Sequence, residues 1–341
     1  MLKVFYFSTL SALLSLTLAA CGGGGSSSGS DDTGPAETTG TFSLDVSDAA
    51  VDDAKRVLVQ FTGVSVKPSS GNAIELPLSG DSQTCLDLLD DSTDPTLTEV
   101  GQATIRCIDL LELEGRKSAS LLDGITLDAG NYNWLRLAVD AQRGVDDSII
   151  VLDGDTWESL YIPSDSQSGL KLNTQFTILA GGSHKFVIDF DLRKSVNNPR
   201  GFPDYRLKPS LRLIDLSESG NIVGNVETTL LTADGCTGDV NTSAGFAVYV
   251  FEEDQTTIGE EGSANAPLTS AAVRFNDDSG LWDYTVGFVA PGRYTVAFTC
   301  QAADDFPETA NDGIVFVESA DSPATVENGQ DSTVNFIPTD S

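Results

Sequence analysis

The chain has 341 residues, with 51 Asp and Glu against 19 Lys and Arg, so its formal net charge is −32. A charge of that sign excludes a nucleic-acid-binding surface spread over the protein, and it disfavours docking on an anionic bilayer through side chains. Hydrophobic residues make up 40% of the chain, which is compatible with a globular protein. The composition therefore predicts an acidic, folded protein that does not bind nucleic acid.

The first 20 residues have the form of an export signal. Lys3 supplies a positive charge, and an apolar run interrupted only by Ser and Thr follows from 4 to 18. That run is short for a transmembrane helix but suits a signal peptide. The string Leu18-Ala19-Ala20-Cys21 resembles the lipobox of bacterial lipoproteins. This resemblance implies cleavage before Cys21 and lipid, including palmitate, on that cysteine; the alternative is an ordinary secretory signal with a chance cysteine.

Residues 21–40 are predicted to form a flexible tether. The stretch 22–34 contains no large apolar residue and therefore cannot contribute to a core. A random coil from Cys21 to Thr41 has a typical reach of roughly 25 Å. In Gram-negative lipoproteins an Asp after the lipidated cysteine usually marks inner-membrane retention, whereas Gly22 here resembles the outer-membrane default. We therefore expect a lipid-anchored envelope protein at the outer membrane, on its periplasmic or its surface face.

Strand patterns run through almost all of the rest of the chain. Polar and apolar residues alternate with a period of two, as in half-buried antiparallel strands, and β-branched and aromatic residues are frequent. In the segment 56–67, for example, Val57, Val59 and Phe61 fall on one face. The strands predicted in the first half are 41–46, 56–67, 134–139, 148–152, 169–178, 185–192 and 205–214, while 107–113 fits either a short helix or a strand.

These patterns predict an all-β protein with two antiparallel β-sandwich domains, Ig-like or prealbumin-like, after the signal peptide and tether. The roughly 300 residues beyond the tether suit two domains. We place them at 41–218 and 219–341.

Four cysteines follow Cys21, and an exported protein meets an oxidising compartment. Four cysteines allow three pairings. Proximity and the domain division favour one bridge in each domain, Cys85–Cys107 and Cys236–Cys300. Zinc is the poorer alternative, because the chain has no Cys-x-x-Cys and only one histidine.

A series of short motifs occurs in a fixed order between residue 40 and about residue 216. The motifs include Leu44-Asp45-Val46-Ser47-Asp48-Ala49, Asp109-Leu110-Leu111, Leu127-Asp128-Ala129-Gly130-Asn131-Tyr132, Ile162-Pro163-Ser164, Asp189-Phe190-Asp191-Leu192-Arg193-Lys194-Ser195 and Tyr205-Arg206-Leu207-Lys208-Pro209. Together they resemble the domain-of-unknown-function family 4382, which is found in bacterial envelope lipoproteins. The match covers about half of the chain, and the order of the motifs makes it fairly specific. The resemblance implies location and architecture and brings no catalytic residue with it.

The second domain contains a turn followed by a strand, Pro291-Gly292-Arg293-Tyr294-Thr295-Val296-Ala297-Phe298. Pro and Gly suit a tight turn, and the residues at 294, 296 and 298 then share one face. The motif resembles prealbumin-like or carboxypeptidase-regulatory-like sandwich modules of secreted proteins. Ala129-Gly130-Asn131-Tyr132 has the same form in the first domain, and either convergent turn chemistry or a duplication explains this.

Catalytic motifs are missing from the sequence. A Ser-His-Asp or Cys-His site needs a histidine, and the single one, His184, stands in a Gly-rich turn, where we expect a surface histidine. There is no Gly-x-Ser-x-Gly, Walker loop or dinucleotide fingerprint. Hydrolysis by paired carboxylates stays open, although no spacing supports it. We therefore predict a protein that is not an enzyme and has no cofactor apart from possible calcium.

Two acidic groups raise the question of a metal. Asp189 and Asp191 share one face of a predicted strand, opposite an apolar face. We expect a salt-bridged structural pair, with Arg193, Lys171 or Arg206 nearby; the alternative is a Ca²⁺ site. The second group consists of acids that we expect to be solvated in the loop after the first strand: Asp45, Asp48, Asp52 and Asp53.

The sequence thus favours a non-catalytic binding or structural module of the cell envelope. Its ligand is an envelope protein or a glycan, and three tryptophans offer a sugar-stacking platform: Trp134, Trp157 and Trp282. Trp157 and Trp282 stand in predicted strands, where core positions are the commoner outcome. The alternatives are an envelope hydrolase that uses carboxylates or a metal, and an accessory subunit of an envelope complex.

Overall fold

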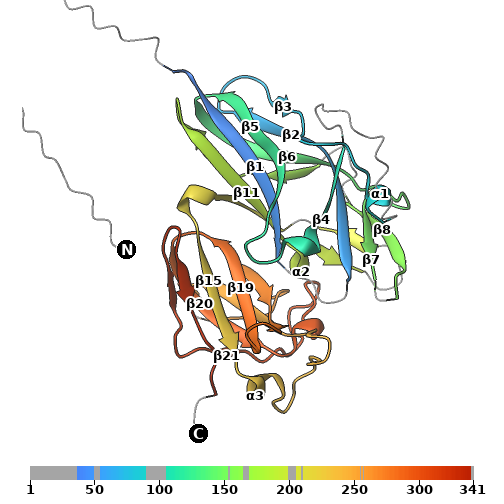
Figure 1. The fold of residues 1–341 in the computed structure, drawn as a ribbon, viewed down its shortest axis with the longest axis vertical. Coiled ribbons are helices and arrows are strands. Elements are labelled where there is room, and N and C mark those ends of the chain that lie inside the picture. The colour runs from blue at the N-terminus through green and yellow to red at the C-terminus, as the bar shows by residue number, and fades with distance from the viewer. Residues whose placement is uncertain are drawn as a thin grey trace, which may run out of the picture. The chain divides into compact units, whose positions relative to one another are not determined.

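The computed structural model describes residues 37–49, 54–89, 105–152, 154–163, 169–198, 205–208, 210–253, 255 and 257–338. Cys21, the predicted signal peptide and the tether up to residue 36 lie outside the described residues. The described part belongs to one compact unit that begins at Glu37. It is nearly all β, as predicted, and its strands form two sandwiches (Figure 1).

The first sandwich consists of strands β1 to β14. One sheet has the order β14-β11-β1-β5, and the other has the order β10-β6-β2-β7-β8-β13-β12, with β3, β4 and β9 paired alongside. The strands are β1 (Thr39–Ala49), β2 (Arg56–Pro68), β3 (Ile74–Leu76), β4 (Arg106–Asp109), β5 (Ala119–Asp128), β6 (Gly130–Asp140), β7 (Ile149–Val151), β8 (Trp157–Tyr161), β9 (Leu170–Leu172), β10 (Phe176–Ile178), β11 (Ser183–Asp191), β12 (Val196–Asn197), β13 (Tyr205–Leu207) and β14 (Leu211–Asp215). Short helical turns are α1 (Cys85–Leu89), η1 (Leu110–Leu113), α2 (Leu192–Ser195) and η2 (Leu216–Glu218).

The second sandwich consists of strands β15 to β23, in sheets of order β18-β19-β15-β23 and β17-β16-β20-β21, with β22 paired to β20. The strands are β15 (Gly220–Val226), β16 (Ala247–Glu252), β17 (Thr269–Ala272), β18 (Arg274–Asn276), β19 (Leu281–Val289), β20 (Gly292–Thr299), β21 (Val317–Glu318), β22 (Ala324–Val326) and β23 (Asp331–Thr333). The helical turns are α3 (Thr228–Leu231) and η3 (Ala302–Asp304). Among the described strand pairs, β1–β11, β8–β13 and β15–β23 are parallel and the others are antiparallel.

Each sandwich has its own hydrophobic core, filled by the alternate residues that the period-two pattern selects. Val57, Val59 and Phe61 of β2 all lie in the first core, as predicted. Leu58 points the other way, yet it is also buried, because a smaller apolar cluster with α1 covers that side of β2. The two cores do not share residues. Whether 41–218 and 219–341 fold as independent domains stays a prediction.

Several predicted strands are interrupted. The segment 169–178 divides into β9 and β10, which pair with β6 on either side of a bulge: three residues lie between Leu172 and Phe176, but only two between their partners Leu135 and Tyr132. The predicted strand 185–192 ends at Asp191, where α2 begins, and 107–113 is a strand followed by the 3-10 turn η1.

Both predicted disulfides are present and each lies within one sandwich. Cys85–Cys107 joins α1 to β4, and Cys236–Cys300 joins the loop after α3 to the end of β20. The sequence separations are 22 and 64 residues, so the chain-entropy account gives each bridge about 3–4 kcal/mol of stabilisation.

The two tyrosine turns noted in the sequence use the same hydrogen bond. The Tyr132 hydroxyl donates to the Asp128 carbonyl at 2.9 Å, and the Tyr294 hydroxyl donates to the Ala290 carbonyl at 2.9 Å. Both rings are buried, and each hydroxyl obtains a hydrogen-bond partner from the carbonyl four residues upstream, which closes the turn.

Within the described residues, no helix is long and apolar enough to span a membrane.

Candidate functional site

Asp189 and Asp191 lie at the end of β11, and both are buried. Arg212 stands opposite Asp189 in the β11–β14 register, and its Nη2 and Nε donate to Asp189 Oδ2 at 2.5 and 3.2 Å. Burial raises the pKa of Asp189, and Arg212 partly offsets this. The cationic partner is thus Arg212. Of the partners considered from the sequence, Lys171 lies over Trp134 and Arg206 donates to Asn197 instead.

Asp191 shares a lysine with a residue of the second sandwich. The Lys194 ammonium lies 3.1 Å from Asp191 Oδ2 and 3.3 Å from Glu261 Oε2, and it donates to the Pro267 carbonyl. The three side chains are 15%, 2% and 0% exposed, respectively, so the group is almost completely removed from water. Lys194, Asp191 and Glu261 together are called the latch below.

Two carboxylates and one ammonium cannot all be paired in the latch. Burial and the charge of Asp191 raise the pKa of Glu261 to about 8, against the opposing effects of Lys194 and Arg193. Burial would lower the pKa of Lys194, but Asp191 and Glu261 outweigh it and raise that pKa. At neutral pH the arrangement therefore favours a charged Lys194 and a neutral Glu261, in the way that two close carboxyl groups retain one proton.

Arg193, beside the latch, also reaches the second sandwich. Its Nη1 donates to the Ala302 carbonyl at 2.8 Å, and its guanidinium lies 5.9 Å from the Tyr249 ring centre. The Tyr249 hydroxyl donates to Asp305 at 2.8 Å, and Asp305 accepts the Glu261 backbone N–H at 3.1 Å. The segment Arg193-Lys194 is therefore the main polar connection between the two sandwiches.

The rim of the same interface carries exposed contacts. Arg274 of β18 binds Glu114 through two hydrogen bonds, of 2.8 and 3.1 Å, and Arg116 binds Asp331 at 2.5 Å. Between these pairs the backbones meet: a Cβ added at Gly287 would lie 1.9 Å from the Gly115 carbonyl oxygen. Only a glycine at 287 permits this approach.

The prediction that Asp45 and Asp48 are solvated acids of a loop is wrong. Both lie within β1, and each is 3% exposed. Asp45 binds Lys185 at 2.9 Å and accepts from the Ser118 hydroxyl at 2.6 Å. The strand runs on to Ala49 because its polar face is covered by protein, which a pattern of alternation does not reveal. Asp52 and Asp53 lie outside the described residues.

No group of three or more His, Cys, Asp or Glu side chains suited to a metal ion occurs in the part of the chain that the structure describes. Calcium binding at Asp189 and Asp191 stays a prediction. In the structure these two carboxylates already pair with Arg212 and Lys194, respectively. His184 does not lie in the expected turn but is the half-buried second residue of β11, where Nε2 accepts the Leu179 backbone N–H at 2.9 Å and the ring stacks on Phe186.

The three tryptophans do not share one surface. Trp282 is 7% exposed in the second core, as expected, whereas Trp157 is 41% exposed on β8, so the expectation of a core position is wrong there. Trp134 is half-buried on β6, opposite Lys67 of β2, whereas Trp157 stands opposite Val151 of β7, which pairs with Arg56 near the other end of β2. Eleven residues of strand from Arg56 to Lys67 span about 36 Å, too far for both rings to contact one sugar.

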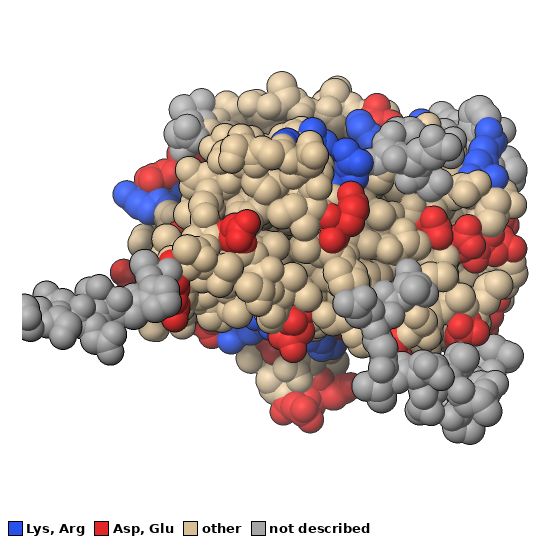
Figure 2. Space-filling model, turned by 90° about the horizontal axis from the view of Figure 1, so that it is seen from above, with Lys and Arg blue, Asp and Glu red and all other residues tan. Residues whose placement is uncertain are grey.

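Trp134 has a different setting, on the outer face of the ten-stranded sheet. The Lys171 ammonium and the Arg136 guanidinium lie 4.8 and 5.0 Å from its ring centre. In register, Arg136 stands between Ser65 and Lys171, and Trp134 stands opposite Lys67. We call Trp134, Arg136, Lys171 and Lys67 the cationic face. On the side of the molecule shown in Figure 2, acids are scattered and basic side chains occur in a few small groups.

Comparison with known proteins gives one family and no close relative. The model of the domain of unknown function DUF4382 matches residues 39–209. No curated protein matches. A leucine-rich repeat protein from Bacteroides thetaiotaomicron is 12% identical over 89% of this chain, with a TM-score of 0.21. A putative cell adhesion protein from Bacteroides fragilis is 10% identical over 86% of this chain and 83% of its own, with a TM-score of 0.18.

The first two structures in this comparison are much longer than the matched region, since the chain spans 26% of the repeat protein and 34% of the Bacillus anthracis TIE protein.

Proposed function

Since this chain belongs to the DUF4382 family, whose function is unknown, we propose that it is a non-catalytic binding module of the bacterial cell envelope, anchored by lipid on Cys21. We further propose that its ligand is an anionic glycan. The observation that carries the proposal is the cationic face, where Arg136 and Lys171 flank the Trp134 ring and Lys67, whose ammonium donates to the Gly71 carbonyl, stands opposite Trp134 in register.

A local cationic group matters even in a protein of net charge −32. The Debye length is about 8 Å at physiological ionic strength, so a bound group responds mainly to the charges next to it. The nearest acid in the same register row is Glu75, which is separated from Arg136 by Ser65 and accepts the Ser65 hydroxyl at 2.6 Å. The carboxylates or sulfates of a sugar polymer therefore meet Arg136 and Lys171 first.

The shape of the face suits a polymer chain. Arg136 and Lys171 lie directly opposite each other on neighbouring strands, and Lys67 lies one strand further in the other direction. Repeated acid groups along a glycan can pair with such a row, while Trp134 offers an apolar edge to a sugar ring. A partly exposed sheet face of this kind differs from the deep pocket that an enzyme for small substrates would present.

The test measures binding of the mature chain to immobilised polygalacturonate, with neutral dextran as the comparison. We expect salt-sensitive binding to the acidic polymer only. Arg136→Gln and Lys171→Gln should each weaken it about two- to fivefold, the range of an exposed charge pair. Lys55→Gln is the matched control, because Lys55 is a surface lysine paired with Asp155. Equal binding to dextran, or equal losses in the control, would contradict the proposal.

Anchoring has a separate test. Cys21→Ala should abolish incorporation of labelled palmitate and release the protein from the membrane fraction. Full incorporation in that variant would show that the lipobox interpretation is wrong, while leaving the glycan proposal to its own experiment.

A further inference from the structure

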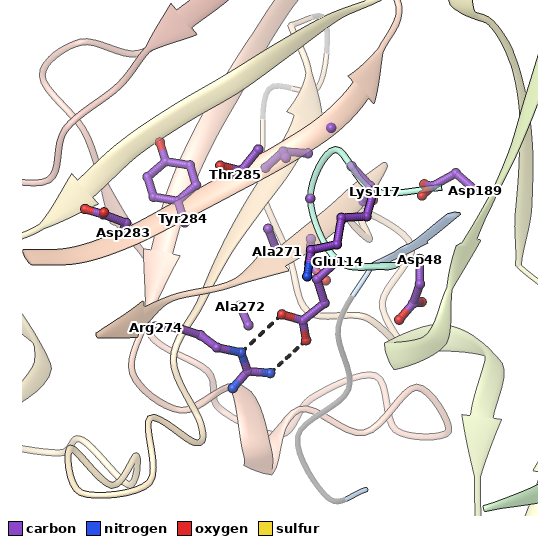
Figure 3. Close-up of a pocket in the computed structure, with 15 residues that line it drawn as sticks. Asp48, Glu114, Lys117, Asp189, Ala271, Ala272, Arg274, Asp283, Tyr284 and Thr285 are labelled. Carbon is purple, nitrogen blue, oxygen red and sulfur yellow. Dashed lines mark hydrogen bonds and ion pairs between the residues drawn. The ribbon is translucent and has the colours of Figure 1, made fainter. Parts of the chain in front are cut away.

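A cavity of about 240 Å³ lies between the two sandwiches, and neither the latch nor the cationic face uses it (Figure 3). One water molecule occupies about 30 Å³ of liquid, so the cavity has room for a small organic molecule. Its polar lining comes from both sandwiches. The first contributes Asp48, Glu114 and Asp189, and the second contributes Ser270, Arg274 and Thr285.

Asp48 is the unusual member of this lining. It is 3% exposed, and among the described residues no side chain donates to its carboxylate, which has only the Leu192 backbone N–H nearby. Burial and the negative charges of Asp189, Glu114 and Asp191 raise its pKa well above the usual value, and the nearby Leu192 N–H opposes this only in part. A carboxylate in that position gains most from a cation.

Ser270, on the second sandwich, is also unsatisfied. It lies in β17, is 2% exposed, and its hydroxyl has no hydrogen-bond partner in the described structure. Buried hydroxyl and carboxylate groups in folded proteins are nearly always hydrogen-bonded. Two such groups in the lining of one cavity therefore point to a polar ligand.

The other acids of the lining already have partners, and Asp283 accepts hydrogen bonds from the Asn276 amide and the Ser279 hydroxyl. Arg212 binds Asp189, and Arg274 binds Glu114 through both of its oxygens (Figure 3). Lys117 also lines the cavity, but in Figure 3 its side chain extends away from Asp48. Among the described lining residues, the buried side-chain oxygens that no other side chain satisfies are those of Asp48 and Ser270.

That pair of groups selects the class of ligand. Calcium takes six to eight oxygen ligands, and the described residues hold no group of three or more metal-ligating side chains. A primary ammonium has only three N–H donors and needs few acceptors. We propose that this cavity binds a small organic cation, whose primary ammonium pairs with Asp48 and which forms a further hydrogen bond with Ser270.

The experiment uses the full mature chain and n-butylamine as the probe, with n-butanol, sodium chloride and calcium chloride at matched ionic strength as comparisons. We expect butylamine to raise the melting temperature in a saturable way beyond the effect of sodium chloride. Asp48→Asn keeps the size of the side chain and removes the carboxyl group that would pair with an ammonium, so it should fold and bind at least tenfold more weakly. Ser270→Ala should weaken binding about threefold, and Asp123→Asn, which changes an exposed acid of the same sandwich, should not alter it.

Three results would overturn the proposal. One is a butylamine shift no larger than that of sodium chloride, or one that persists in Asp48→Asn. Another is a saturable calcium shift that depends on Asp48, because the ligand would then be a metal ion. The third is a butylamine shift that appears only in Lys117→Met, because Lys117 would then be the natural partner of Asp48.

Discussion

Replacing Lys194 by Met should destabilise the protein far more than its single charge suggests. The change leaves Asp191, 2% exposed, without the ammonium that lies 3.1 Å away. Removing one partner of a buried ion pair costs about 3–5 kcal/mol. We expect the lower end, about 3 kcal/mol at pH 7, because Glu261, whose pKa is about 8, is already mostly neutral and adds no second uncompensated charge.

The control crosses the same interface at its exposed rim. The Arg116–Asp331 pair is shorter, at 2.5 Å, but its side chains are 50% and 42% exposed. Exposed pairs contribute about 0–1 kcal/mol, so Arg116→Met should change stability little. Urea unfolding of both variants, with the slope and midpoint fitted separately, gives the two free energies.

The comparison has a clear point of failure. If burial decides the strength of these contacts, the Lys194 variant must lose at least twice as much free energy as the Arg116 variant. Equal losses, or a Lys194 variant as stable as the parent protein, would refute the reasoning. In a Glu261→Gln background the loss should persist, because Asp191 still loses its partner.

Two further predictions concern the same interface. Because the pKa of Glu261 is raised in the folded state to about 8 from its usual 4.5, the folded protein holds this proton more tightly than the unfolded chain does. The resulting stabilisation is complete below about pH 4.5 and is lost as pH rises through 8, so the unfolding free energy should fall between about pH 4.5 and 8, by at most about 1.4 kcal/mol per pH unit, and level off above that. Glu261→Gln should flatten that slope in urea titrations. Gly287→Ala should lower the unfolding free energy by about 1–3 kcal/mol, followed by thermal melting, because the new methyl group would lie 1.9 Å from the Gly115 carbonyl oxygen. Gly63→Ala is the control and should be neutral, because its methyl group would meet only Ala138, at 3.9 Å. A neutral Gly287→Ala would mean that the two backbones separate freely.

Local sequence predicts the elements of this protein well. Val57, Val59 and Phe61 are in the core because alternation in a strand is a property of each strand by itself. Both disulfides follow from the compartment and from proximity. The bulge between β9 and β10 could not be predicted from residues 169–178 alone. It arises from how these residues pair with β6, and that register depends on both strands.

The latch and the cavity could not be predicted in the same way. Asp48, Asp189 and Asp191 have the alternation of a solvent-facing side, and only contacts with residues that are distant in the sequence show that this side is covered. A usable indication was present in Asp189-Phe190-Asp191-Leu192-Arg193-Lys194, where four charged residues stand within six. So dense a mixture of both signs at the end of a strand suggests mutual pairing, although it does not identify Glu261 as the third partner.

The position of β1 has a mechanical consequence. The predicted tether joins the described chain at the start of this strand, and β1 lies between β11 and β5, in register with β11 from Thr41 to Ala49. A pull on the tether therefore acts along the strand and loads its hydrogen bonds to both neighbours together, in shear, and does not peel them open one after another. Forced unfolding is governed by the rate of crossing that barrier, so the first sandwich is built to resist traction at the end by which it would be held.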